Sequence, residues 1–154
     1  MKTFLILSDT HGNLTAIRKL KEIIGESDYV IHLGDNKSDI KEIAIQYPNK
    51  VYAVNGNCDG GRVEEKILEV EGFKILLTHG HAFNVKEGLS RLNYYMQEKD
   101  INIALYRHTH IPSVESFNGR HFINPGNMKG FSDKTYCYMI LHNGSITTKI
   151  VNVF

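Results

Sequence analysis

The sequence predicts an α/β fold, a four-layer α-β-β-α sandwich in which two mixed β-sheets pack face to face between outer helices. Over residues 3–54, apolar runs of strand length alternate with amphipathic helical segments. This alternation is typical of parallel strands joined by right-handed crossovers. The second half consists mostly of short apolar runs joined by tight turns, which indicate hairpins. A chain of 154 residues can bury a substantial core, and we expect a single domain spanning residues 1–154.

The first half contains three continuous apolar runs that we interpret as buried parallel strands. They are Thr3–Leu7, Tyr29–Leu33 and Val51–Val54. Two helices are expected between them. The first covers Leu14–Ile24, with Asn13 as its N-cap and Gly25 as its end. The second begins at a cap formed by Ser38 or Asp39 and ends before Pro48.

The second half is predicted to form a second group of strands with one helix. The expected strands are Lys66–Val70, Phe73–Leu77, Ile103–Tyr106, Val114–Phe117, His121–Ile123, Tyr136–Leu141 and Ile146–Val153. The expected helix covers Val85–Lys99. Asn-Gly pairs at 118–119 and 143–144 indicate two-residue hairpin turns, because both of their residues tolerate positive φ.

Composition excludes several classes of protein. The 18 basic and 17 acidic residues nearly cancel, so no general polyanion-binding surface is implied, and we expect no strong binding of nucleic acid. No apolar stretch approaches the roughly 20 residues of a membrane span. Two cysteines and an apolar run too short for a signal peptide favour a cytoplasmic protein.

Polar groups that can bind metal ions follow five of the predicted strands. They are Asp9, His11, Asp35, Asn57, His79, His108 and His110. Residues two apart in extended chain point to the same side, so Asp9 and His11 can reach one ion together. Seven oxygen and imidazole donors exceed what one tetrahedral site needs and suit two ions sharing a bridging carboxylate.

These motifs, in this order, resemble those of the calcineurin-like metallophosphoesterases. The resemblance covers Asp9-x-His11, Gly34-Asp35, Gly56-Asn57, His79-Gly80-His81 and His108-x-His110, and it extends from Thr3 to Asn127. The small size and the segment Gly56-Asn57-Cys58-Asp59 resemble the bacterial and archaeal phosphodiesterase branch. The resemblance implies the metallophosphoesterase fold and a hydrolase that cleaves a small phosphodiester by in-line attack of a metal-bridging hydroxide.

The resemblance also implies a role for each ligand. Asp9, His11 and His110 would hold one ion, Asn57, His79 and His108 would hold the other, and Asp35 would bridge them. We expect two divalent ions, manganese first, with nickel, zinc or iron as alternatives for such ligands. The candidate catalytic residues are Asn57, Cys58, Asp59 and Arg107.

Two of these residues depart from the family pattern. Cys58 stands where many members have histidine, and a thiol is a weaker proton donor that carries no positive charge. Arg107 stands where glycine usually precedes the His-x-His pair. Either the loop tolerates this side chain or Arg107 points inward and clamps phosphate. If the family glycine requires positive φ, Arg107 would be strained.

Other readings remain open. A non-catalytic interaction scaffold is one, since the retromer subunit of the same fold has lost metal-site residues. Nuclease activity is a weaker one, because the chain has no basic patch. A homo-oligomer is compatible with the sequence. Histidines without a paired partner, namely His32, His121 and His142, are interpreted as ordinary core or surface residues.

Overall fold

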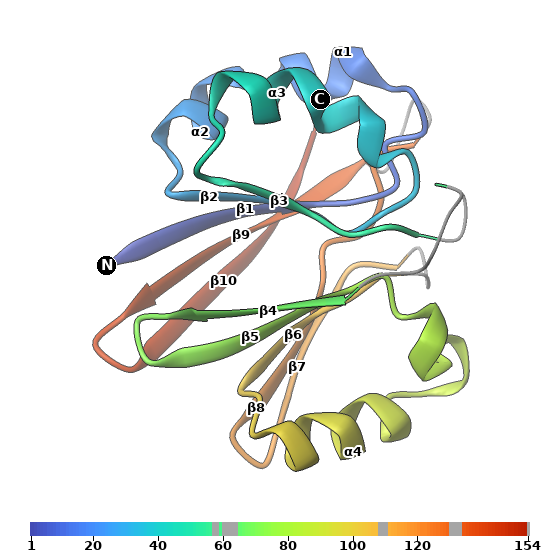
Figure 1. Ribbon diagram of the computed structural model, residues 1–154, viewed down its shortest axis with the longest axis vertical. Helices are drawn as coiled ribbons and strands as arrows, with labels where there is room; N and C mark the ends of the chain where they lie inside the picture. The colour runs from blue at the N-terminus through green and yellow to red at the C-terminus, as the bar shows by residue number, and fades with distance from the viewer. Residues whose placement is uncertain (57–58, 60–64, 108–110, 130–133, 154) are drawn as a thin grey trace.

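Two five-stranded sheets packed against each other form the centre of the molecule, and helices cover their outer faces (Figure 1). The computed structural model describes residues 1–56, 59, 65–107, 111–129 and 134–153. In Figure 1, helices α1 to α3 cover one sheet and α4 covers the other. The predicted four-layer α/β sandwich is confirmed.

The first sheet has the strand order β10-β9-β1-β2-β3. Its strands are β1 (Lys2–Leu7), β2 (Tyr29–His32), β3 (Val51–Ala53), β9 (Thr135–His142) and β10 (Ser145–Asn152). β1, β2 and β3 are parallel, with Leu5 opposite Val30, as the alternation of strands and helices predicts. The C-terminal hairpin pairs antiparallel with β1, so the sheet is mixed.

The second sheet has the order β4-β5-β6-β8-β7. Its strands are β4 (Glu65–Val70), β5 (Phe73–Thr78), β6 (Ile103–Leu105), β7 (Ser113–Phe117) and β8 (Arg120–Asn124). The central strands β5, β6 and β8 are parallel, whereas β4 and β7 pair antiparallel at the two edges. Both sheets therefore bring the carboxyl ends of parallel strands to one edge of the sandwich.

Burial explains why the predicted strands read as continuous apolar runs. A fully buried cluster between the sheets combines Phe4 and Ile6 of β1 with Ile75 and Leu77 of β5. The alternate residues of β1, Leu5 and Leu7, pack on the other side against the helices. Strands buried on both faces show no polar alternation.

The helices are shorter than predicted. They are α1 (Leu14–Arg18), α2 (Lys21–Glu26), α3 (Lys41–Gln46) and α4 (Ser90–Lys99). The predicted helix 14–24 is broken at Leu20, whose φ of −95° and ψ of 9° interrupt the hydrogen-bond ladder. The predicted helix 85–99 begins as a separate 3-10 turn, Val85–Glu87, because Gly88 has a φ of 133°.

The predicted Asn13 cap and the two Asn-Gly turns are confirmed, whereas the predicted cap of the second helix is not. Asn13 caps α1 by accepting a hydrogen bond from the Ala16 N–H. Both Asn-Gly turns have positive φ at both central residues, as predicted. The prediction that Ser38 or Asp39 caps the second helix is wrong: a 3-10 turn (Lys37–Ile40) precedes α3, and Asp39 bonds to the β1 loop instead.

None of the helices within the described part of the chain combines the length and apolar character needed to cross a lipid bilayer.

Candidate metal centre

Four predicted site residues lie together at the carboxyl ends of the parallel strands. Asp9 and Asp35 follow β1 and β2 in one sheet, while His79 and Arg107 follow β5 and β6 in the other. Backbone hydrogen bonds hold each pair of loops together. The Asp9 N–H donates to the Gly34 carbonyl, and the Arg107 N–H donates to the His79 carbonyl; each hydrogen bond is 3.0 Å long. The two sheets thus bring residues almost a hundred positions apart to one place.

A potential ligand cluster is formed by Asp9, Asp35 and His79. One ligand atom from each lies within 4.8 Å of the others, and all three residues are buried. The His79 Nε2 atom is 3.5 Å from Asp35 Oδ2, while its Nδ1 atom is 2.8 Å from the Leu33 carbonyl. Because a carbonyl only accepts, Nδ1 carries the proton and Nε2 presents its electron pair toward Asp35. This arrangement is characteristic of a metal-binding histidine.

The two carboxylate oxygens of Asp9 have different surroundings. Oδ2 accepts a hydrogen bond of 2.7 Å from the Ser8 hydroxyl and contacts Arg107 Nε. Oδ1 is buried and has no hydrogen-bond partner among the described residues. Its neighbour is His11 Nε2, at 3.6 Å. A buried acceptor without a donor is costly, and a cation satisfies it. The residues present therefore fit a divalent metal ion.

Burial changes the proton affinity of both members of the Asp9–Arg107 pair. It raises the pKa of the Asp9 carboxyl, and the adjacent guanidinium opposes that shift. It lowers the pKa of Arg107, and the attraction to Asp9 opposes that change. Desolvation disfavours each charged form, so the two charges depend on one another.

The loops that carry the ligands adopt a left-handed backbone. Asp9, His11 and Asp35 have φ values of 54°, 44° and 60°, and Asn36 follows at 64°. Residues other than glycine rarely adopt these angles, and such strain concentrates at functional sites. Arg107 is not among the described residues with positive φ, so replacing glycine at this position does not strain the backbone.

Asp59 binds the backbone of the loops that carry the cluster. Its carboxylate accepts backbone hydrogen bonds from Asp35, Lys37 and Gly56, each 2.8 Å long. One side chain thereby fixes the segment after β2 against the segment after β3. Adjacency to Asn57 was the only sequence signal for Asp59, and it did not reveal this backbone role.

His32, interpreted from the sequence as an ordinary core or surface residue, is a functional candidate. It is fully buried. Its Nδ1 accepts from the Gly34 N–H at 3.1 Å, so its Nε2 donates to the Thr10 hydroxyl, also at 3.1 Å. Thr10 in turn donates to Asp39 Oδ2 at 2.6 Å, which also accepts from the Gly12 N–H. This chain links the two loops that carry Asp9 and Asp35. A histidine within an otherwise apolar buried strand was the available signal.

The buried His32 ring predicts a loss of stability in acid. Burial lowers its pKa from 6.5 to about 4. Between these values the unfolded chain binds a proton that the folded chain does not, so stability falls as pH falls from 6.5 and the loss is complete below 4. The loss in the free energy of unfolding assigned to His32 is about 3 kcal/mol. Urea unfolding at about pH 7 and about pH 4 measures it.

His32→Gln removes the titrating ring. The variant is expected to lose about 3 kcal/mol less free energy of unfolding than wild type between about pH 7 and about pH 4. The matched control is His142→Gln, because His142 is exposed at the end of β9. If His32→Gln and wild type lost the same free energy of unfolding in acid, the interpretation of His32 would be wrong.

Asn57, Cys58, His108 and His110 lie outside the described residues. Of the other predicted residues, Asp9, Asp35 and His79 form the cluster, and His11, Arg107 and Asp59 adjoin it through the contacts given above.

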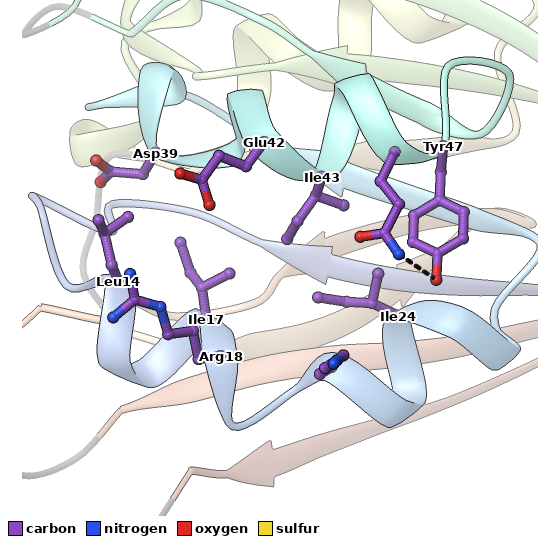
Figure 2. Close-up of a pocket in the computed structure, with 10 residues that line it drawn as sticks. Leu14, Ile17, Arg18, Ile24, Asp39, Glu42, Ile43 and Tyr47 are labelled. Carbon is purple, nitrogen blue, oxygen red and sulfur yellow. Dashed lines mark hydrogen bonds between the residues drawn. The ribbon is translucent and has the colours of Figure 1, made fainter.

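Figure 2 shows a pocket of about 180 Å³ between the α1–α2 segment and α3. Leu14, Ile17, Ile24 and Ile43 point into it, and the Tyr47 hydroxyl accepts a 3.4 Å hydrogen bond from Gln46. None of the three cluster residues lines this pocket. We therefore place the candidate site at the strand ends.

Comparison with known proteins identifies the family of the chain. The calcineurin-like phosphoesterase superfamily domain matches residues 1–145. The chain belongs to this superfamily.

Relatives of this superfamily member match over most of its length. The probable metallophosphoesterase YsnB of Bacillus subtilis is 33% identical, over 94% of this chain and 88% of the relative. A phosphodiesterase of Methanocaldococcus jannaschii is 34% identical, over 82% of this chain and 84% of the relative. The crystal structure of a predicted phosphoesterase from Streptococcus pneumoniae superposes with a TM-score of 0.81 at 25% identity, covering 99% and 92% of the two chains. The chain is thus a metal-dependent phosphoesterase by family.

Proposed function

We propose that the protein hydrolyses a small phosphodiester and that Mn²⁺ is its working ion. The observation that carries the proposal is the buried cluster of Asp9, Asp35 and His79, with one acceptor of Asp9 left for a cation. Two carboxylate ligands and one imidazole suit Mn²⁺, and Ni²⁺, Zn²⁺ and Fe²⁺ are alternatives. When bound, such an ion supplies positive charge for the phosphate and activates water for attack on phosphorus.

The surroundings of the cluster favour a diester. One hollow, of about 510 Å³, includes Asn36 and Lys37, the residues that directly follow Asp35. Another, of about 370 Å³, includes His11 and Lys134. A phosphodiester carries two organic groups on one anionic phosphate, and we propose that these two hollows accept the two groups. The phosphodiesterase among the relatives supports the same substrate class.

The protein's own residues position this chemistry. Asp59 holds the backbone of Asp35, and the Leu33 carbonyl fixes the ring of His79. Asn57, His108 and His110 stay proposed ligands, Cys58 stays a proposed substrate-side residue, and the binuclear arrangement stays what the family resemblance implies. The expectations of a cytoplasmic location, a single domain and a homo-oligomer also stay predictions.

Hydrolysis of bis(p-nitrophenyl) phosphate by metal-stripped protein, with and without Mn²⁺, tests the proposal. We expect activity to appear with Mn²⁺ and to fall at least about 100-fold in His79→Ala, because residues that only support a metal ligand already contribute roughly 10- to 100-fold. His142→Ala is the matched control, since this histidine is exposed and lies in β9. Wild-type protein that stays inert with every divalent ion would instead support the scaffold alternative.

A further inference from the structure

The side chain of Arg107 is the most unusual group in the candidate centre. It is fully buried, and it ranks among the largest fully buried side chains of the described residues. Its Nε contacts Oδ2 of Asp9. An arginine is almost never fully buried without a charged partner, and Arg107 finds its partner in a residue of the candidate metal cluster.

This contact gives the two oxygens of the Asp9 carboxylate different surroundings. Oδ2 is committed to protein donors, the Ser8 hydroxyl and the guanidinium. Oδ1 has no hydrogen-bond partner among the described residues. Asp9 therefore has one oxygen available for a metal ion. Glycine at position 107, as the family resemblance leads one to expect, would leave both oxygens without this guanidinium.

The charges in this buried volume also favour one divalent ion over two. Asp9 and Asp35 contribute two negative charges, and the guanidinium paired with Asp9 contributes one positive charge. With one divalent ion the net charge is +1, and with two it is +3. A second ion bridged by Asp35 would share this volume with a charge of its own sign, in surroundings that screen charges poorly.

We propose that Arg107 replaces one of the two cations of the expected centre, so that a single divalent ion binds among Asp9, Asp35 and His79. The inference rests on the proposed function, since it concerns the same site. In this arrangement the guanidinium keeps part of the positive charge that a phosphate anion requires. The sequence suggested a direct clamp on phosphate for Arg107, and in the structure its Nε contacts Asp9.

The number of bound ions tests this inference without reference to activity. Metal-stripped protein is titrated with Mn²⁺ by calorimetry, and the bound metal is counted after equilibrium dialysis. We expect one Mn²⁺ per wild-type chain, with the electron paramagnetic resonance spectrum of an isolated ion. Arg107→Gly is expected to bind two and to show the spectrum of a coupled pair. Arg107→Lys keeps the charge and is expected to remain at one.

Two Mn²⁺ ions per wild-type chain would overturn the inference and leave the proposed phosphodiesterase function intact. A single ion in folded Arg107→Gly would also overturn it, because the guanidinium would then not be what excludes the second ion. Arg107→Met, which keeps the volume and removes the charge, gives the same comparison if the glycine variant does not fold. Wild type that binds no divalent ion would refute the proposed function itself.

Discussion

Replacing Asp35 by asparagine is expected to lower kcat/KM for a phosphodiester by about 1,000-fold, since residues that only support a ligand already contribute roughly 10- to 100-fold. Asp35 Oδ2 lies 3.5 Å from Nε2 of His79. Asparagine keeps the shape of the side chain and removes its charge. It also tolerates the left-handed backbone at position 35, where φ is 60°. The fold should therefore survive while the affinity for Mn²⁺ falls.

Asp100→Asn is a matched control for this substitution. Asp100 also has a left-handed backbone, with φ of 56°, but it lies exposed at the end of α4. The same chemical change in the same backbone conformation is expected to leave both Mn²⁺ binding and kcat/KM at wild-type values. Steady-state kinetics and Mn²⁺ titration of the two variants separate loss of a ligand from a general effect of removing an aspartate. Wild-type kcat/KM in Asp35→Asn would remove Asp35 from the centre.

The fold could be predicted because each strand has a strong local signal. Thr3–Leu7 and Tyr29–Leu33 are apolar except for Thr3 and His32, as is typical of strands buried on both faces. The helix boundaries were predicted less well. Spacing of apolar residues does not show that Leu20 leaves the helical conformation, or that Gly88 separates a 3-10 turn from α4.

The candidate site shows a similar division. Asp9, Asp35 and His79 were predictable because each lies two positions after the end of an apolar run. The groups that hold them in place were not, since their action is through backbone atoms and bonds between distant segments. Asp59 binds three N–H groups of neighbouring loops, and His32 reaches Thr10 across 22 positions. Local sequence pattern carries no record of either contact.

The second large effect is expected from Gly56→Ala, which adds a single methyl group. A Cβ at this position would lie 2.5 Å from Asp35 Oδ1, 2.6 Å from the Asp35 backbone nitrogen and 3.0 Å from His79 Cε1. The backbone of Gly56 is not left-handed, so the effect comes from space alone. Asp35 must move, and the bonds that Gly56 and Asp35 donate to Asp59 must lengthen. We expect Mn²⁺ affinity to fall about 10- to 100-fold and stability to fall by about 1–3 kcal/mol.

Gly25→Ala is the control, since its Cβ would meet only the Tyr47 hydroxyl, at an ordinary 3.5 Å. This glycine lies exposed inside α2, where alanine is expected to raise stability by up to about 1 kcal/mol. Calorimetric Mn²⁺ titration and urea unfolding of both variants test the two effects together. If Gly56→Ala bound Mn²⁺ like wild type, the ligand positions would not depend on the contact between the loops after β2 and β3. The close approach of Gly56 to Asp35 would then be a matter of packing, and Asp59 would lose its role in aligning the ligand.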